Sequence, residues 1–475
     1  MESISYNKTK IVATVGPASS SKEMLRALIK EGVDVFRLNF SHGTHEHHQK
    51  VIDFVRELNP EMGTNVALLQ DLQGPKIRVN DVMDHVALVP GQEFIITTRE
   101  LIGNNEIAST SYKELPRDVK VGNMILIDDG KIELTVKEVR DIDIVCEVKY
   151  GGPLKPRKGI NLPQTKVTAP SLTDKDHADL LFGLKNKLDW VALSFVRKAK
   201  DIEALREIIN QHNPNTRIVA KIEKPEAIEN IDAIIAATDA VMVARGDLGV
   251  EIWLEEVPMM QKMIVQKCNK LAKPVIVATQ MMESMIENPR PTRAETNDVA
   301  NAVMDGADAL MLSAETAAGK YPLEVIRSMV RTIGSVEKLG NIFYKFREVE
   351  PDSPSYQTDS IILSACKLAK EVNAKAIVGM TLLGYSAYKA ASHRPNANIF
   401  AFSSNAQIIN MMNLVWATRA YHYDNASSTD DTIADVEAIL KRDGHVKSGD
   451  IFIVLASMPI HAKGRTNMIK VNVVK

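Results

Sequence analysis

The sequence has few cysteines and no long apolar run. Its three cysteines, Cys146, Cys268 and Cys366, lie far apart and show neither a pairing nor a metal-ligand spacing. This usage favours a reducing compartment. No apolar stretch approaches the roughly 18 residues that a membrane span needs, and the polar first residues contain no signal-peptide core. We therefore expect a cytoplasmic protein.

A strong excess of charge is also missing. The chain has 58 lysines and arginines against 60 aspartates and glutamates, a net charge of −2, which argues against a general binder of nucleic acid or membrane surfaces. It contains no P-loop pattern, no GxGxxG after a strand and no GxSxG elbow. Four histidines at 42, 45, 47 and 48 lack acidic or cysteine partners, so we expect them to begin a solvated helix and not to bind zinc.

The chain does have a regular alternation of short apolar runs and helix-like segments. Its 475 residues are enough for two or three domains. Eight strands, each followed by a helix, predict a closed parallel (β/α)8 TIM barrel. An open doubly wound sheet has the same periodicity, and the count of eight favours the barrel. The expected strands are 10–16, 33–40, 65–72, 189–195, 217–222, 240–246, 274–279 and 309–315.

Two other regions follow a different pattern. Residues 75–163 contain alternating apolar and polar residues and a segment rich in glycine and proline, which predicts an inserted β domain at the rim of the barrel. A polar linker precedes a further α/β domain. We therefore expect a barrel over 1–74 and 164–345, a lid-like β-barrel domain over 75–163, and a C-terminal α/β domain over 352–475.

Polar residues follow most of the expected barrel strands. Catalytic groups of parallel barrels gather at these carboxyl ends. A carboxylate at a strand end can simply cap the next helix, which would account for any one residue but poorly for the whole set. The strand-end residues are Arg37, Asn39, Ser41, Asp71, Lys221, Glu223, Arg245, Gly246, Asp247, Thr279, Gln280, Ser313 and Glu315.

Two acidic residues in this set suggest a divalent cation. Glu223 and Asp247 end adjacent strands, so their carboxylates could share one hard cation whose other ligands are waters and substrate oxygens. Lys221 points to the same face as Glu223, and Arg37 adds a second positive group. These charges predict a small, multiply anionic ligand, with a phosphate or carboxylate group. The backbone amide of Gly246, at the start of a helix, could donate a hydrogen bond to this ligand.

At this point the sequence resembles the pyruvate kinase family. The matching segments occur in family order and span nearly the whole chain: TKIVATVGPAS, FRLNFSHG, GPKIR, KGINLP, VALSFVR, AKIEKPEA, VMVARGDLGVE, ATQMMESM, PTRAETNDVANAVMDGADALMLSAETAAGKYPLE and TNMIKV. The resemblance implies phosphoryl transfer from phosphoenolpyruvate to ADP, giving pyruvate and ATP in the last step of glycolysis. It also implies Mg²⁺ as cofactor, with Mn²⁺ as an alternative, and an allosteric homotetramer.

The resemblance further assigns roles to individual residues. Glu223 and Asp247 would bind Mg²⁺, and lid closure would bring the nucleotide-binding residues to the phosphates and exclude water. The implied catalytic residues are Arg37, Lys221, Thr279, Ser313 and Glu315; the substrate-binding residues are Arg37, Lys221, Ala244, Arg245, Gly246, Asp247 and Thr279; and the nucleotide-binding residues are His42, Arg78 and Lys158.

One short segment indicates which branch of the family the chain resembles. Members that require K⁺ usually carry a glutamate at the position of Lys76 and a threonine at Leu72, and bind K⁺ through groups equivalent to Asn39, Ser41 and Asp71. This chain, with Leu72, Gln73 and Lys76, resembles the K⁺-independent branch. A tethered ammonium can supply the positive charge of the bound ion. A solvated loop lysine is the alternative for Lys76, and it leaves Leu72 unexplained. We expect K⁺ not to be required.

The chain departs from the family pattern at two further places. Ala314 replaces a common glycine, a small change that we expect activity to survive. The expected effector loop, 380–386, is apolar except for Thr381 and Ser386, which predicts weak phosphate binding and argues against regulation by fructose 1,6-bisphosphate. Two other functions remain as alternatives: a Mg²⁺-dependent barrel lyase, which would not need the basic residues of the lid, and an inactive sugar-phosphate-binding regulator, against which the intact site residues argue.

Overall fold

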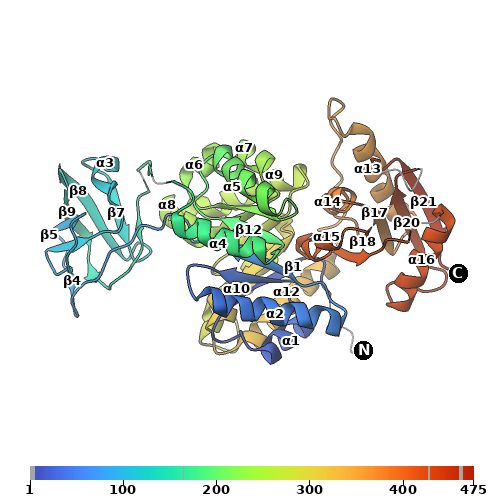
Figure 1. Cartoon of the computed structure of the whole chain (residues 1–475), viewed down its shortest axis with the longest axis horizontal. Coiled ribbons are helices and arrows are strands. Elements are labelled where there is room, and N and C mark those ends of the chain that lie inside the picture. The colour runs from blue at the N-terminus through green and yellow to red at the C-terminus, as the bar shows by residue number, and fades with distance from the viewer. Residues whose placement is uncertain (1–5, 164, 169, 426–427, 459–463) are drawn as a thin grey trace.

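Three structural parts lie in a row along the longest axis of the molecule. A computed structural model describes residues 6–163, 165–168, 170–425, 428–458 and 464–475. In Figure 1 the inserted domain lies at the left end, the barrel in the middle and the C-terminal domain at the right end. Among the described residues, no helix combines the length and the apolar character needed to cross a membrane.

The central part is a closed parallel barrel, as the sequence predicts. In the described part of the chain each of its eight strands pairs in parallel with both neighbours, so the open doubly wound sheet is excluded. All eight expected strands are confirmed, and seven of them are one to three residues shorter than expected. They are β1 (Lys10–Val15), β2 (Val35–Asn39), β3 (Ala67–Asp71), β12 (Trp190–Leu193), β13 (Arg217–Ile222), β14 (Ala240–Ala244), β15 (Val275–Ala278) and β16 (Ala309–Leu312).

Helices surround this barrel. Their ends carry local signals: α10 begins with the capping box of Thr292 and Glu295, as the sequence indicates, and α1 ends at Gly32, whose φ of 115° suits glycine. The helices of the barrel are α1 (Lys22–Glu31), α2 (His45–Met62), α4 (Asp174–Lys185), α5 (Ala199–His212), α6 (Pro225–Glu229), α7 (Ile231–Ala237), α8 (Arg245–Glu251), α9 (Val257–Lys270), α10 (Arg293–Asp305), α11 (Ala314–Ala317) and α12 (Pro322–Leu339).

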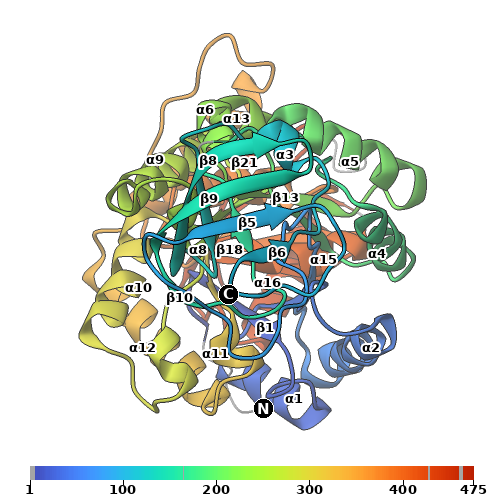
Figure 2. The same ribbon diagram turned by 90° about the vertical axis from the view of Figure 1, so that its left-hand side faces the viewer.

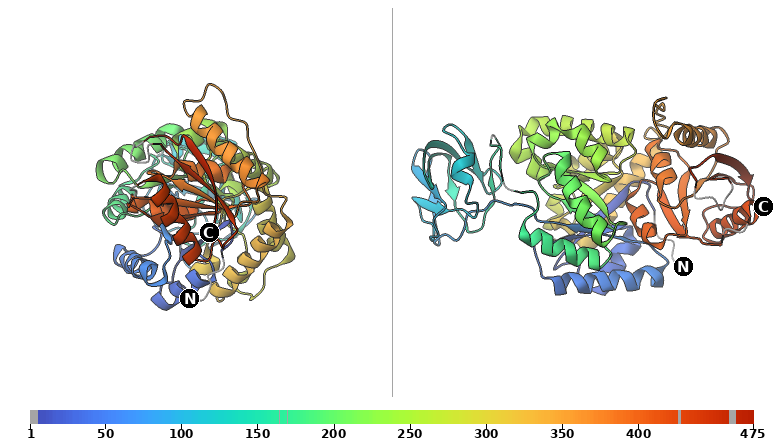
Figure 3. Two further views of the ribbon diagram at one scale, coloured as in Figure 1. Left: turned by 90° about the vertical axis from the view of Figure 1, so that its right-hand side faces the viewer. Right: turned by 45° about the horizontal axis from the view of Figure 1, so that its top comes forward.

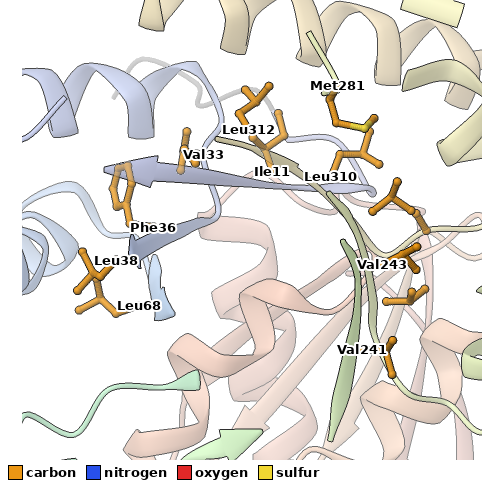
Figure 4. Packing of buried hydrophobic residues seen from close by; sticks show 14 of the residues in the cluster. Ile11, Val33, Phe36, Leu38, Leu68, Val241, Val243, Met281, Leu310 and Leu312 are labelled. Carbon is orange, nitrogen blue, oxygen red and sulfur yellow. The ribbon is translucent and has the colours of Figure 1, made fainter. Parts of the chain in front are cut away.

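The strands of the barrel are buried on both faces. Outward side chains such as Phe36 and Leu38 pack in the layer between strands and helices, part of which Figure 4 shows. Side chains at alternate positions, such as Val35 and Trp190, fill the barrel interior. This double burial explains why the strands appear in the sequence as nearly continuous apolar runs.

The histidine-rich segment starts a helix, as expected, but it is only partly exposed to solvent. Thr44 caps α2 by accepting the amide hydrogen of His47. His48 is buried and stacks on Phe40 with ring centroids 4.2 Å apart, so the expectation of a solvated face is wrong for this residue. The imidazole of His45 lies 2.7 Å from the carboxylate of Asp179 on α4.

The insertion after β3 forms a separate β structure with its own core. Its described strands form a six-stranded sheet in the order β11-β7-β8-β9-β5-β6 and a short β10-β4 pair. Figure 2 shows this sheet in front of the barrel. The elements are β4 (Ala87–Leu88), β5 (Glu93–Thr97), β6 (Ile107–Ser109), α3 (Leu115–Asp118), β7 (Met124–Ile127), β8 (Ile132–Arg140), β9 (Asp143–Tyr150), β10 (Gly152–Pro153) and β11 (Ile160–Asn161).

The C-terminal domain is an α/β sheet that covers the opposite end of the barrel (Figure 3). Its described strands lie in the order β19-β18-β17-β20-β21. Four of them match the segments that the sequence indicates as strands here, KAIVGM, ANIFAFSS, DIFIVLAS and NMIKVNVV, whereas β19, with the polar sequence TRAYH, was not expected. The elements are α13 (Tyr356–Glu371), β17 (Ala376–Met380), α14 (Tyr385–Ser392), β18 (Asn398–Ser403), α15 (Ala406–Met411), β19 (Thr418–His422), α16 (Thr429–Arg442), β20 (Ile451–Ala456) and β21 (Met468–Val473).

This domain also closes the amino-terminal end of the barrel. Ile408 and Met411 of α15, with Leu414, belong to the same apolar cluster as the side chains inside the barrel. The side-chain amide of Asn413 donates a 2.7 Å hydrogen bond to the carbonyl oxygen of Asn65, just before β3. The carboxyl ends of the strands, where the expected site lies, therefore face the insertion.

Candidate active site

Lys221 lies at the centre of the polar groups at the carboxyl ends of the strands. Its ammonium nitrogen is 2.9 Å from Glu223 Oε1 and 3.2 Å from Asp71 Oδ1, and it donates a 2.8 Å hydrogen bond to Ser194 Oγ. Burial by itself would lower the pKa of Lys221, but the carboxylates of Asp71 and Glu223 outweigh it and raise that pKa above its usual value. Lys221 therefore remains a fully charged ammonium.

A second cation shares the carboxylate of Asp71. Arg37 Nε donates a 2.6 Å hydrogen bond to Asp71 Oδ2, and Arg37 Nη1 donates to Thr14 Oγ1 at 2.9 Å. Burial tends to raise the pKa of Asp71, but Lys221 and Arg37 together hold it below the usual value. Asp71, at the end of β3, thus orients two cations from different barrel strands, Arg37 of β2 and Lys221 of β13, which suits a ligand with several negative charges.

Two further carboxylates, those of Glu223 and Asp247, lie near Lys221. Glu223 Oε2 accepts the amide hydrogen of Phe195 at 2.7 Å, and Asp247 lies in the first turn of α8. Burial raises the pKa of Glu223; Lys221 opposes this rise and the negative charge of Asp247 adds to it. A divalent cation would relieve this repulsion, and two carboxylates suit Mg²⁺, which keeps waters and substrate oxygens as its other ligands. The donor set therefore fits a magnesium-type cation.

The segment after β14 provides backbone groups to this site. Gly246 N donates a 2.7 Å hydrogen bond to Thr279 Oγ1. A β-carbon at Gly246 would lie 3.4 Å from the side chain of Thr279, an ordinary van der Waals contact. Thr279 itself has a φ of 70°, uncommon for a β-branched residue. Strained backbone of this kind is concentrated at functional sites.

Arg245 is held by contacts within the barrel. Its Nη1 donates to Asp298 Oδ1 at 2.7 Å, and its Nη2 donates to the carbonyl oxygen of Thr279 at 2.7 Å. Ala244, the residue before α8, is buried. The guanidinium of Arg245 therefore fixes the loop after β15 against α8.

Glu315 connects two strand ends. Its Oε2 accepts the amide hydrogen of Ser313 at 2.7 Å and its Oε1 that of Met282 at 3.2 Å. Burial raises the pKa of Glu315, and these backbone hydrogen bonds limit the rise. Glu315 therefore joins the end of β16 to the segment that follows Thr279.

Two of the three expected monovalent-cation ligands, Asn39 and Ser41, lie at the end of β2 and in the loop that follows it; the third, Asp71, is the last residue of β3. Asn39 Oδ1 accepts the amide hydrogen of Ser41 at 3.1 Å, and the carbonyl oxygen of Asn39 accepts that of His42 at 3.2 Å. Burial, followed by the positive charges of Arg78 and Lys76, lowers the pKa of His42. Cationic side chains thus surround this loop.

Two of the three residues expected near the nucleotide, Arg78 and Lys158, lie on the two segments that join the insertion to the barrel, whereas His42 lies in the loop after β2. Val79 N donates to the carbonyl oxygen of Lys158 at 2.9 Å, and Arg78 pairs with Gly159 in an isolated bridge. The ammonium of Lys158 lies 2.8 Å from Asp128 Oδ1. Lys76 precedes this pairing on the first segment. Lys76, Arg78 and Lys158 therefore all lie at the junction of the insertion and the barrel.

Two site contacts were not expected from the sequence. Ser194, just after β12, contacts Lys221, and Thr14 on β1 contacts Arg37. Each is a polar residue near the end of an apolar strand, and this position was the only feature of the sequence that could have indicated a role in the site. Leu72 is 1% exposed, and its carbonyl oxygen accepts the hydroxyl of Ser194 at 2.7 Å.

The fold and the site define a TIM-barrel enzyme for a strongly anionic substrate. A family model of the pyruvate kinase barrel domain matches residues 6–326, and one of the pyruvate kinase α/β domain matches 359–472. Curated pyruvate kinases from Staphylococcus haemolyticus and Geobacillus stearothermophilus are 42% and 43% identical, over 98% of this chain and 80% of each relative. A crystal structure of a pyruvate kinase from Cryptosporidium parvum has a TM-score of 0.91 and 35% identity, over 99% of this chain and 96% of that one.

The chain belongs to the pyruvate kinase family. It is a phosphotransferase with pyruvate kinase activity, which forms pyruvate and ATP in glycolysis. The family uses a divalent metal ion. These findings exclude the two alternative functions, a Mg²⁺-dependent barrel lyase and an inactive sugar-phosphate-binding regulator.

Proposed function

We propose that Lys221 is the main catalytic residue for the transfer of the phosphoryl group from phosphoenolpyruvate to ADP. The observation that supports this role is the position of its ammonium between Asp71 and Glu223, 3.2 and 2.9 Å away. A charged, buried donor at this position would stabilise the phosphoryl group in transit and the enolate that develops as it leaves. Arg37, oriented by Asp71, would hold the phosphate.

We propose that Glu223 and Asp247 hold Mg²⁺, with Mn²⁺ as an alternative. When bound, the ion supplies positive charge to the phosphate and enolate oxygens. The amides of Gly246 and Asp247, with Ala244, Arg245 and Thr279, would bind the substrate carboxylate. Arg245 would do so by fixing the backbone, because its guanidinium already bonds Asp298 and the carbonyl of Thr279.

For the last chemical step, protonation of the enolate, we propose Thr279, Ser313 and Glu315. Glu315 ties the amides of Ser313 and Met282 together and would order the water chain that delivers the proton. We also propose the domain boundaries 1–74 with 164–345, 75–163 and 352–475. His42, Arg78 and Lys158 would contact the nucleotide phosphates when the 75–163 domain closes and excludes water.

We further propose that the enzyme is K⁺-independent, because Lys76 supplies the positive charge of a monovalent cation. Two observations support this. Lys76 lies close enough to the loop of Asn39 and Ser41 to lower the pKa of His42. Leu72 is packed in the apolar cluster and brings no side-chain oxygen to the site.

An assay in tetramethylammonium buffer, with phosphoenolpyruvate, ADP and Mg²⁺ and with or without added KCl, tests this proposal. We expect substantial pyruvate formation without K⁺. Strict dependence on K⁺ would contradict the role of Lys76 but leave the phosphoryl transfer in place. Finally, we propose a cytoplasmic homotetramer; the three buried free cysteines support a reducing compartment.

A further inference from the structure

Glu251, the last residue of α8, is a buried carboxylate to which the proposed reaction assigns no role. The helix lies at the end of the barrel that faces the insertion (Figure 1), and Glu251 is 3% exposed. Its Oε1 lies 2.7 Å from the ammonium of Lys224 and accepts a 3.0 Å hydrogen bond from the side-chain amide of Asn161. Its Oε2 is buried and has no hydrogen-bond partner among the described residues. The paired ammonium of Lys224 therefore compensates the cost of burying this charge.

Each residue of this ion pair belongs to a segment that carries one of the two expected metal ligands. Lys224 directly follows Glu223. Glu251 lies four positions after Asp247, which places these two carboxylates on the same side of α8. The ion pair therefore connects the end of β13 to α8. Because the separation of the two ligands decides whether both can reach one ion, a contact that fixes their segments relative to each other also supports the metal site.

The ion pair also has neighbours on both segments that join the insertion to the barrel. Asn161 belongs to β11, on the second of these segments, three positions after Lys158. On the first segment, a β-carbon at Gly74 would lie 2.8 Å from the ring of Phe195, so this glycine packs directly against the ring. The ammonium of Lys224 lies 6.0 Å from the centre of the same ring. The ion pair thus lies between the metal-binding segments and the insertion.

We propose that Glu251 is a positioning residue of this enzyme. Through Lys224 it holds the two expected metal ligands at a fixed separation, and through Asn161 it fixes the second insertion segment to the same site. Glu251 acts through the segments that it joins, because its Oε1 is already bonded to the ammonium and the amide. This inference rests on the proposed Mg²⁺ site and adds the group that supports it.

Binding of Mn²⁺ to the full-length protein without substrates, measured by electron paramagnetic resonance of the free ion, tests the contact with the metal site. Glu251→Gln keeps the size of the side chain and an acceptor for Asn161 but removes the charge. Groups that support metal ligands contribute about 10–100-fold to metal affinity, so we expect the dissociation constant to rise about tenfold, equivalent to ~1.4 kcal/mol. Lys224→Met should have the same effect, and Lys224→Arg, which keeps the charge, should retain most of the affinity. Glu229→Gln, exposed at the end of α6, is the matched control and should bind Mn²⁺ as the wild type does.

The double variant Lys224→Met/Glu251→Gln shows whether the two residues act as one unit, and it leaves neither charge of the pair buried alone. Its dissociation constant for Mn²⁺ should match that of the single variants and should not rise about a hundredfold, because residues in direct contact are not additive. Circular dichroism shows that the variants are folded. Additive effects, or wild-type Mn²⁺ binding in the Glu251 variant, would overturn the proposal.

Asn161→Ala tests the contact with the insertion. It removes one hydrogen bond and leaves the ion pair, so we expect wild-type Mn²⁺ affinity, a KM for ADP that is roughly three- to tenfold higher, and little change in KM for phosphoenolpyruvate. A merely structural role would not separate the two KM values, and an unchanged KM for ADP would overturn the link to the insertion. Glu223→Gln should lose Mn²⁺ binding. Wild-type binding in that variant would instead overturn the proposed metal site, and this inference with it.

Discussion

Ser194 Oγ accepts a 2.8 Å hydrogen bond from the ammonium of Lys221. The same hydroxyl donates its hydrogen to the carbonyl oxygen of Leu72 at 2.7 Å, so its orientation is fixed. Ser194 is 2% exposed and water cannot easily replace it. Ser194 is therefore a positioning residue that directs the ammonium towards the reacting groups.

Replacing Ser194 by alanine should lower kcat more than it changes KM for phosphoenolpyruvate. A hydrogen bond to a charged group contributes about 1.5–3 kcal/mol, so we expect kcat to fall by roughly ten- to a hundredfold. Steady-state kinetics check this, and Ser194→Thr should restore part of the loss because it keeps the hydroxyl. A wild-type kcat in the alanine variant would show that Ser194 does not position Lys221.

Lys221→Met should abolish phosphoryl transfer. The loss of one preorganised positive group at the transferring phosphoryl costs at least about a hundredfold in kcat. A coupled assay of pyruvate formation measures it, with circular dichroism to show that the fold remains. Lys200→Met, exposed on α5, is the control and should keep full activity. An active Lys221 variant would assign the chemistry to another group.

Exchanging Lys76 for glutamate and Leu72 for threonine should make the enzyme dependent on K⁺. The change replaces a fixed positive charge by a negative one, which a bound monovalent cation can balance. Activity measured without K⁺ should fall and should return on addition of KCl. Lys76→Met, which removes the charge without adding a carboxylate, should respond less to KCl. If the double variant stays active in K⁺-free buffer, Lys76 is only a loop lysine.

Asp189→Asn should stabilise the protein, and more so at higher pH. The native carboxyl titrates at about 7 and the unfolded one near 3.8, so the native state keeps a proton that the unfolded state releases between these values. Stability is thus lost as pH rises from the lower to the higher value, and asparagine avoids this loss. The gain in free energy of unfolding should grow from about pH 4 to about pH 7, where it reaches a few kcal/mol, and then level off; thermal denaturation of both proteins across this pH range measures it. An equal gain at all pH values would exclude the buried ionisation as its cause.

The barrel could be predicted from the sequence because its strands are buried on both faces. Runs such as WVAL and AVMVA have no polar member, and their spacing matches a barrel. The polar residues that follow these runs could be recognised because each comes directly after an uninterrupted apolar strand. β19 was not expected, since its sequence TRAYH places polar residues in the strand.

The contacts that the sequence did not predict depend on residues far apart in the chain. Ser194 was one serine after an apolar strand, and only the closed barrel brings it to Lys221 from 27 positions away. A cavity between the barrel and the C-terminal domain is lined by Arg56, Asp189 and Gln407, and no local pattern relates these positions. Periodicity reports burial within one element, and it carries no information on which elements meet.

The three apolar residues that close the amino-terminal end of the barrel limit how this chain can be divided. Ile408, Met411 and Leu414 follow the last barrel strand by almost a hundred positions, yet they complete the interior packing of the first domain. A truncated chain that ends before α15 would leave the base of the barrel open to water. The barrel of this chain is therefore not an independent structural unit. Chimeras with other family members would have to exchange the barrel and α15 together.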